Sequence, residues 1–232
     1  LLDINTAYTR KIQAFNSGGV ATSAAVTKYT SIETASIATY EGVATNEVTI
    51  YAGNNFTNIT TGLSGILFEK LRPGGLSSSE TSPWRRNNGY TFSSLSTNTQ
   101  YDFRISSRNG DGIISGVLDG INRFTLIETP LGATYEGVTT NSITIHSSND
   151  ISNLVTGESG ILFERTSPLM LSGSDWVIPT SGWIKTNTWA HSGLSPNKQY
   201  TFKITTRNGT SEIGGTKEGL TKYTLAAIPN TP

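Results

Sequence analysis

The chain carries few residues that could do chemistry. Two serines lie between glycines, Ser64 in TGLSGI and Ser159 in TGESGI. A serine nucleophile on a nucleophile elbow needs the spacing G-x-S-x-G and a histidine base. Both segments miss this spacing by one residue, and no histidine has a triad-like setting. We therefore interpret both serines as parts of a turn that precedes a strand.

Carboxylates are the second candidates. Glu41 and Glu69 could supply the acid and the base of a glycoside hydrolase. However, Glu136 and Glu164 hold the same places in a second, repeated segment, and two adjacent active sites in such small repeats would be unusual. We predict structural or surface roles for these four residues, and we expect no catalytic residue and no enzyme activity.

Metal and cofactor sites are not expected either. The chain has no cysteine, and its two histidines, His146 and His191, lack ligating neighbours. The segment RNGDGIISGVLDG places Asn and Asp at loop spacing but lacks the acidic density of a calcium loop. An ordinary turn is predicted there, with no metal and no cofactor.

Composition excludes further classes of protein. The 232 residues include 17 Lys plus Arg and 17 Asp plus Glu, and charged residues make up only 15% of the chain. Without a basic field, nucleic acid is not an expected partner. No apolar run approaches the roughly 20 residues that span a bilayer, so we expect no membrane insertion. Ser, Thr, Asn and Gly interspersed with Val, Ile and aromatic residues favour strands joined by turns.

An internal repeat sets the domain organisation. Residues 38–70 align without gaps to residues 133–165, with 20 of 33 positions identical. The second copy then gains about four residues, after which the two copies return to register up to Pro130 and Pro229. We predict one domain over 35–129, a second over 130–229, and the start of a linker at 230–232.

Each repeat alternates apolar and polar residues, which is the pattern of half-buried strands. In QYTFKITTR, the side chains of Tyr200, Phe202 and Ile204 fall on one face, and Thr and Lys fall on the other. About seven such short strands per hundred residues, separated by Gly, Asn, Ser and Pro, are typical of a two-sheet sandwich. We therefore predict an all-β fold of tandem immunoglobulin-like β-sandwiches.

The turn Leu194-Ser-Pro-Asn-Lys-Gln-Tyr200 resembles the entry to strand F of a fibronectin type III domain. In that family a tyrosine hydroxyl hydrogen-bonds to the backbone a few residues upstream, the tyrosine corner. Tyr101 repeats the motif in the first domain. The order of the other strands fits the same family, in the variety that recurs in long secreted bacterial proteins. The resemblance covers nearly the whole chain and implies fibronectin type III-like domains of an extracellular or cell-surface protein.

One feature of that family is missing. The Trp that usually follows strand B is replaced by Ala52 in the first repeat and by Ser147 in the second. Other rings are needed to fill the volume. We expect them to be Trp84, Trp183, Tyr40 and Tyr135.

Residues 1–34 match the end of each repeat, and we predict that they are strands F and G of an incomplete domain. Tyr8 falls at the place of Tyr101 and Tyr200, so it is predicted to be a third tyrosine corner. Arg10 falls where the repeats have Phe, so its charged head is expected either to reach an edge or to shift the local register. The missing strands belong either to upstream residues of the same polypeptide, which we favour, or to another chain, as in donor-strand assemblies.

Aromatic side chains are the candidates for binding, because exposed rings are common platforms for sugars and proteins. An apolar insertion in the second repeat, around Trp176, is costly to leave in water. The candidate contacts to a partner or glycan are Trp176, Met170, Leu171, Trp189 and Arg85. Three residues match the N-glycosylation sequon, a pattern common by chance in Thr-rich chains: Asn55, Asn58 and Asn208.

Three hypotheses for function follow. The first is a structural role as spacer or as building block of a filament, surface layer or adhesin, with other copies of the protein or other surface proteins as partners. Neutral charge, tandem repetition and short joints such as LIETPLGATYEG favour it. The alternative is a set of glycan- or protein-binding accessory modules of a secreted enzyme or adhesin. The third, an enzyme, lacks a convergent site.

Overall fold

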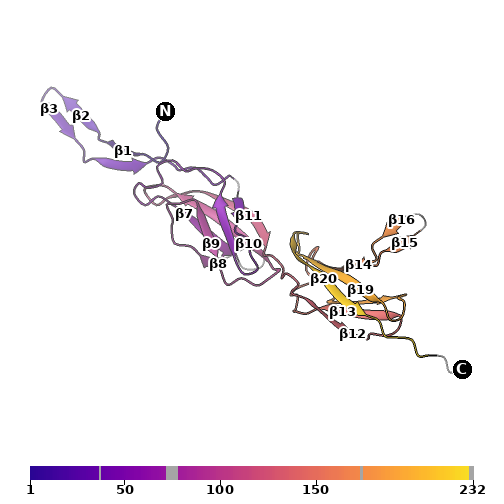
Figure 1. Cartoon of the computed structure of the whole chain (residues 1–232). Coiled ribbons are helices and arrows are strands. Elements are labelled where there is room, and N and C mark those ends of the chain that lie inside the picture. The colour runs from indigo at the N-terminus through magenta and orange to yellow at the C-terminus, as the bar shows by residue number, and fades with distance from the viewer. Residues whose placement is uncertain (37, 72–77, 173–174, 230–232) are drawn as a thin grey trace. The chain divides into compact units, whose positions relative to one another are not determined.

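The computed structural model describes residues 1–36, 38–71, 78–172 and 175–229. These residues form strands joined by turns, and no helix occurs among them (Figure 1). The prediction of an all-β chain is therefore confirmed. Within the described ranges, no helix long and apolar enough to cross a membrane is present.

Spatial contacts divide the chain into two compact units, which are described separately. Unit 1 comprises residues 1–43, 47–93 and 101–123, and unit 2 comprises residues 44–46, 94–100 and 124–232. The predicted domain boundaries follow the sequence repeat, whereas these units follow contacts in space. As a result, the turn at 94–100 groups with the chain that follows residue 123.

Unit 1 begins with four short strands in two antiparallel pairs. The pairs are β1 (Ala7–Arg10) with β4 (Val26–Tyr29), and β2 (Gln13–Asn16) with β3 (Gly19–Thr22). These strands lie at the positions predicted for strands F and G, each interrupted once. Arg10 is exposed, and its guanidinium lies 5.4 Å from the centre of the Tyr8 ring. The charge at this position therefore stays in water, as expected.

The rest of unit 1 is a two-sheet sandwich. One sheet has the order β11 (Ile114–Phe124), β10 (Gln100–Arg108), β7 (Gly65–Leu71), β8 (Ser78–Thr81). The other has the order β5 (Ala38–Glu41), β6 (Val48–Ala52), β9 (Gly89–Phe92). Val48 and Ile50, alternate residues of β6, are fully buried, and the rings of Phe92 and Phe103 meet across the sheets at 5.3 Å. The period of two thus sends one face of each strand into the core.

Unit 2 has the same two sheets and one addition. One sheet has the order β17 (Thr180–Ile184), β14 (Gly160–Ser167), β19 (Gln199–Arg207), β20 (Ile213–Tyr223). The other has the order β12 (Ala133–Glu136), β13 (Ser142–Ser147), β18 (Thr188–Ser192). The addition is a hairpin of β15 (Met170–Ser172) and β16 (Asp175–Val177), drawn apart from the sandwich in Figure 1.

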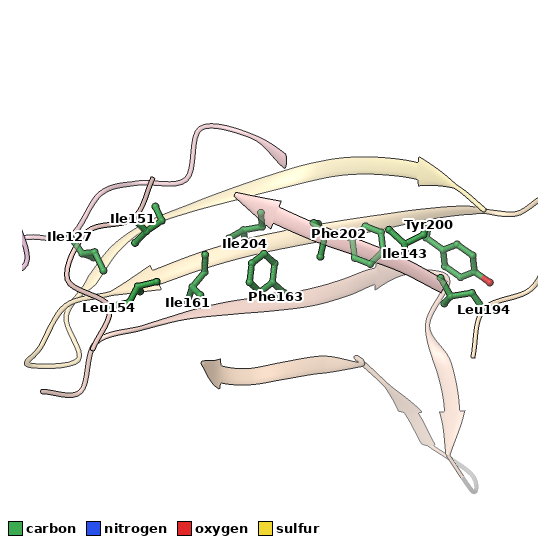
Figure 2. Close-up of a cluster of buried hydrophobic side chains, with 11 residues drawn as sticks. Ile127, Ile143, Ile151, Leu154, Ile161, Phe163, Leu194, Tyr200, Phe202 and Ile204 are labelled. Atoms are coloured by element: carbon green, nitrogen blue, oxygen red, sulfur yellow. The ribbon is translucent and has the colours of Figure 1, made fainter. Parts of the chain in front are cut away.

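Figure 2 shows the buried core of unit 2, to which both sheets contribute. Its members are Ile127, Ile143, Ile145, Ile151, Leu154, Ile161, Phe163, Leu194, Tyr200, Phe202 and Ile204. The half-buried ring of Trp189 packs against this core, T-shaped on Phe202 at 6.3 Å and stacked on Phe163 at 6.4 Å. Tyr135 also packs against it, as expected.

The prediction that Trp84 and Trp183 fill the core is wrong. Both rings are only half-buried. The guanidinium of Arg108 lies 4.2 Å from the centre of the Trp84 ring, and that of Arg207 lies 4.4 Å from the Trp183 ring. In each unit a guanidinium thus lies over one face of the tryptophan ring, so that face is not packed in the apolar core.

Candidate functional site

The two serines singled out in the sequence lie in equivalent loops. Ser64 precedes β7 in unit 1, Ser159 precedes β14 in unit 2, and both are buried. Each loop turns at an asparagine of positive φ, Asn58 at 53° and Asn153 at 54°. Asn adopts this conformation more readily than most residues. The loops therefore form the turn that was predicted before each strand.

In unit 1 this loop encloses the side chain of Asn5, which is fully buried. Its Nδ2 donates to the carbonyl oxygen of Asn58 at 2.8 Å and to Ser64 Oγ at 2.9 Å. Its Oδ1 accepts from the Ser64 hydroxyl at 3.1 Å and from the Gly110 N–H at 3.0 Å. Both ends of the amide are thus satisfied by protein groups, as a buried amide requires.

Unit 2 contains the same arrangement around Asn98, which is also fully buried. Its Nδ2 donates to the carbonyl oxygen of Asn153 at 2.9 Å and to Ser159 Oγ at 2.9 Å. Its Oδ1 accepts from the Ser159 hydroxyl at 3.1 Å and from the Gly209 N–H at 3.0 Å. We call each of these two arrangements an asparagine contact, formed by one Asn with its Asn carbonyl, Ser hydroxyl and Gly N–H.

The turn that carries each asparagine is held in shape by a threonine farther along the chain. Asn5 has a φ of 46° and Asn98 a φ of 47°. Thr30 in unit 1 and Thr125 in unit 2 fasten the turns, since the N–H of the residue after each asparagine donates to the threonine Oγ1 at 3.0 Å. The side chain is therefore oriented before it enters its loop, which lowers the entropy cost of forming the contact.

An aromatic ring covers the glycine of each contact. A Cβ added to Gly110 would lie 2.3 Å from the Tyr29 ring, and one added to Gly209 would lie 2.2 Å from the Phe124 ring. Such distances leave no room for a side chain. Glycine is therefore required at both positions because an aromatic ring packs directly on the backbone.

The segment that follows each ring adds an apolar and an acidic contact. Ile32 and Ile127 are buried. The carboxylate of Glu33 accepts the Thr57 N–H at 3.1 Å in unit 1. In unit 2 the carboxylate of Glu128 accepts the equivalent N–H, that of Ser152, at 3.0 Å. Each contact is thus surrounded by further bonds to the same loop.

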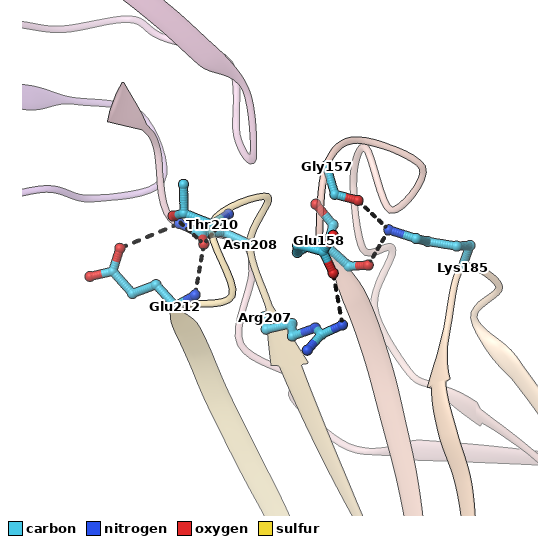
Figure 3. Close-up of polar contacts among 8 residues, drawn as sticks. Gly157, Glu158, Lys185, Arg207, Asn208, Thr210 and Glu212 are labelled. Atoms are coloured by element: carbon cyan, nitrogen blue, oxygen red, sulfur yellow. Dashed lines mark hydrogen bonds and ion pairs between the residues drawn. The ribbon is translucent and has the colours of Figure 1, made fainter. Parts of the chain in front are cut away.

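A basic side chain holds the far end of each loop. In unit 2, Lys185 Nζ donates to the carbonyl oxygens of Gly157, at 2.8 Å, and of Ser159 (Figure 3). In unit 1, Arg86 occupies the matching place and donates to the carbonyl oxygen of Gly62 at 2.9 Å. The charges satisfy carbonyl groups that the turn leaves without a strand partner.

The loop that supplies Gly209 is an asparagine-centred turn. Asn208 Oδ1 accepts from the N–H groups of Thr210 and Glu212, at 3.1 and 2.9 Å (Figure 3). Asn109 forms the same turn in unit 1. The turn at Asn109 lies in the segment RNGDGIISGVLDG, which was compared with a calcium loop in the sequence. No group of His, Cys, Asp or Glu that could hold a metal occurs in the part of the chain that the structure describes.

The chemistry of the asparagine contact is that of attachment. A nucleophilic serine needs an adjacent base, whereas the hydroxyls of Ser64 and Ser159 both accept from and donate to an amide. A buried polar group that loses its partner costs about 1–3 kcal/mol. Each contact therefore favours holding its two chain segments together, and removing the amide leaves several groups without a partner.

A solved structure shares this architecture. A two-domain fibronectin type III segment from chicken tenascin matches with a TM-score of 0.54 and 15% identity, covering 79% of this chain and 95% of that chain. The fold is that of fibronectin type III domains. The FN1–FN3 domains of chicken CNTN1 match with a TM-score of 0.33 and 12% identity, covering 94% of this chain and 77% of that chain. No protein-family model matches the chain, and no curated protein matches it in sequence.

The tyrosines at the fibronectin type III corner positions make the following contacts. Tyr8 Oη accepts the N–H of Asp3 at 2.8 Å, and Tyr200 Oη accepts the N–H of Ser195 at 2.7 Å. Each bond reaches five residues upstream. Tyr101, at the third position, is half-buried in β10.

The candidate residues for partner or glycan contact are distributed over separate elements. Met170 is exposed in β15, whereas Trp189 faces the core of its sandwich. Arg85, in unit 1, donates to Asn87 Oδ1 at 2.7 Å and lies 5.5 Å from the Tyr90 ring centre. The side chains of Leu171 and Trp176 lie outside the described part of the structure. Met170 and Trp189 therefore do not form one common face.

The carboxylates considered for catalysis lie on strands. Glu164 pairs with Lys203 at 2.7 Å between neighbouring strands, and Glu136 lies 3.5 Å from His146. Glu41 is exposed. Glu136 and Glu164 thus belong to cross-strand pairs.

Two of the three sequon asparagines are engaged in the fibronectin type III framework. Asn208 is fully buried. Asn58 Nδ2 donates to the Ile4 carbonyl oxygen and to Thr6 Oγ1, both at 3.0 Å. Asn55 is exposed. A glycan on Asn58 or Asn208 would displace bonds that the fold uses, whereas Asn55 is accessible.

Unit 2 also buries a basic pair. Arg165 and His191 are 4% and 9% exposed, and the Arg165 Nη1 lies 3.3 Å from His191 Nε2. Burial, together with the charge of Arg165, lowers the pKa of His191 to about 4. Because a guanidinium only donates, the neutral imidazole accepts through Nε2. Phe92 stands at the place of His191 in unit 1.

The contacts of Asn5 and Asn98 were not predicted from the sequence. A signal was present, because the three turns DINT, STNT and SPNK carry an asparagine three residues before each corner tyrosine. Its meaning was hidden because Ser64 is 59 residues from Asn5, and Gly209 is 111 residues from Asn98.

Proposed function

We propose that the chain is a run of structural modules, one for each predicted fibronectin type III-like domain, of a larger extracellular or cell-surface protein. In this proposal the asparagine contact fixes one module to the next. The observation that carries this proposal is the recurrence of the same contact, with matching partners and distances, in both units. Ligand sites are open to their ligands, whereas here protein groups already satisfy both ends of each buried amide. The modules serve as spacers or building blocks, with other copies of the module or other surface proteins as partners, and without enzyme activity.

A double-mutant cycle on the full chain tests this role. Asn98→Gly keeps the positive φ and removes the amide, and Ser159→Ala removes the hydroxyl. We expect each change to lower the free energy of unfolding of unit 2 by about 1–3 kcal/mol. Because both changes break the same contact, the double variant should cost at least about 1 kcal/mol less than the sum.

Urea unfolding measures the cycle, and hydrogen exchange of the Gly209 N–H reports the contact directly. That proton is bound to Asn98 Oδ1 and should exchange slowly in the parent chain and rapidly in Asn98→Gly. Strictly additive changes together with unaltered exchange would reject the contact as the joint.

A second candidate function, binding of a protein or glycan, is favoured by the β15–β16 hairpin. Leu169, Met170, Val177 and Ile178 lie on or beside it with 38–48% of each side chain exposed. Exposed apolar clusters commonly mark binding surfaces. Tryptophan fluorescence during titration with polysaccharides, and a glycan array, test this role. A response that is lost in Met170→Ser with Val177→Ser supports it, and flat responses reject it for glycans.

A further inference from the structure

The chain has a third copy of the turn that carries the asparagine contact. Asn197 has a φ of 50°, and its N–H donates to the Leu225 carbonyl oxygen at 3.0 Å. The next N–H, of Lys198, donates to Thr224 Oγ1 at 3.1 Å. These are the bonds that hold the turns of Asn5 and Asn98. The third asparagine is therefore oriented as the other two are.

The surroundings of this third asparagine are open. Asn5 and Asn98 are fully buried, but Asn197 is exposed, and its side chain has no hydrogen-bond partner among the described residues. Tyr223 stands where Phe124 stands in the second turn and is 55% exposed, compared with 7% for Phe124. Both the amide and the ring that would complete a contact are thus uncovered.

We propose that Asn197 and Tyr223 form a docking surface for a further module of this kind, one that follows β20 in sequence. In such a module, a Ser hydroxyl and a Gly N–H would receive the Asn197 amide as Ser159 and Gly209 receive Asn98. The Tyr223 ring would lie on that glycine. This proposal rests on the proposed function, because it assumes that the asparagine contact joins modules.

The chain itself points to this occupant. Within the described residues, the two loops that receive an asparagine, those of Ser64 and Ser159, already hold Asn5 and Asn98. A second copy of the same chain therefore offers Asn197 no free loop of this kind. In unit 2, residues Phe124 to Pro130 form a short connection. It leads from the ring that covers Gly209 to the module whose loop receives Asn98. The segment from Tyr223 to Pro229 has the same length. A module joined to that segment would meet Asn197 in the same way.

Three substitutions make the third surface weaker than the other two. Beside the turn of Asn197, Ala226 and Ala227 stand where the turn of Asn98 has Ile127 and Glu128, and Lys198 stands in the place of Thr99. The third surface therefore lacks the buried isoleucine side chain and the carboxylate that accepts an N–H of the loop. A short covalent joint offsets this loss by keeping the receiving loop at a high effective concentration. Docking should then depend strongly on Asn197.

An extended chain tests the proposal. Residues 1–229 are followed by a second copy of residues 131–232, and hydrogen exchange of the asparagine side-chain amides is measured by NMR. We expect the Asn197 amide to exchange at least about tenfold more slowly than in the parent chain, because it becomes hydrogen-bonded and buried. Ser→Ala in the appended copy, at the position of Ser159, should restore the parent rate.

The outcomes separate the two proposals. Fast exchange at Asn197 beside slow exchange at Asn98 overturns the docking surface and leaves the proposed function intact. Fast exchange at both residues overturns the proposed function. As a second measurement, Asn197→Gly should leave the unfolding midpoint of the parent chain unchanged and lower that of the extended chain. The same effect in both chains overturns the docking surface.

Discussion

At the scale of single residues, the asparagine contact needs an amide. Asn98 donates to a carbonyl oxygen and accepts from an N–H at the same time. A carboxylate of the same shape could only accept, and it would place a negative charge against the Asn153 carbonyl oxygen. A leucine could make neither bond. The same logic applies to Ser159, whose hydroxyl is both acceptor and donor toward the amide.

A second property at this scale is the pH dependence that His191 confers on unit 2. Its folded-state pKa of about 4 lies below the ordinary value of 6.5, so the unfolded state binds more protons between these values. The stability that unit 2 gains from keeping His191 neutral is therefore fully present above about pH 7. It is lost as the pH falls toward 4, by up to about 3 kcal/mol. Urea unfolding of unit 2 between pH 4 and 8 measures this slope.

The control for that prediction comes from unit 1. His191→Phe copies the residue at Phe92 and removes the titrating group. The slope of unit 2 between pH 4 and 7 should then largely disappear, even if the stability at pH 7 changes through the lost bond to Arg165. A slope that persists in His191→Phe would assign the acid sensitivity to other groups.

At the scale of elements, the segment between β11 and β12 helps to build the core of unit 2. Ile127 is 1% exposed and belongs to the core cluster (Figure 2). Glu128 accepts the Ser152 N–H, and the Thr206 hydroxyl donates to the Glu128 carbonyl oxygen at 2.7 Å. The segment is thus packed and hydrogen-bonded as a part of unit 2.

This packing predicts the effect of truncating the segment. Ile127→Ala should lower the free energy of unfolding of unit 2 by about 2–4 kcal/mol, because it leaves a cavity in a closed core. Ile228→Ala is the matched control, since Ile228 is 90% exposed and should change stability by less than about 0.5 kcal/mol. Chemical denaturation measures both. Equal losses of stability in the two variants would show that Ile127 does not anchor the segment in the core of unit 2.

The strands and the internal repeat could be predicted from the sequence, whereas the asparagine contact could not. Alternation in segments such as QYTFKITTR is a local property, so it identified β19 and the buried Phe202. The partners of Asn98 lie far along the chain, and pairing them requires the fold. Trp84 was misplaced because hydrophobicity favours burial, while the Arg108 guanidinium above its ring is visible only in space.

At the scale of the whole molecule, 17 basic residues balance 17 acidic residues, so net charge creates no strong self-repulsion in the folded chain. Each unit has its own buried residues. Ile50 of β6 and Ile145 of β13 hold equivalent places in the repeat, and both are fully buried. The two units should therefore unfold in separable steps, each governed by its own core.

Equivalent core variants test this independence. Ile50→Ala should lower the melting temperature of unit 1, and Ile145→Ala that of unit 2, each by roughly 10 °C or more. Differential scanning calorimetry resolves the steps, and hydrogen exchange assigns them to the units. The step of the unchanged unit should stay within about 2 °C of its parent value, since Ile50 and Ile145 belong to separate cores. A single step that moves as a whole in both variants would mean that the units fold as one cooperative body, and the modular description would then be wrong.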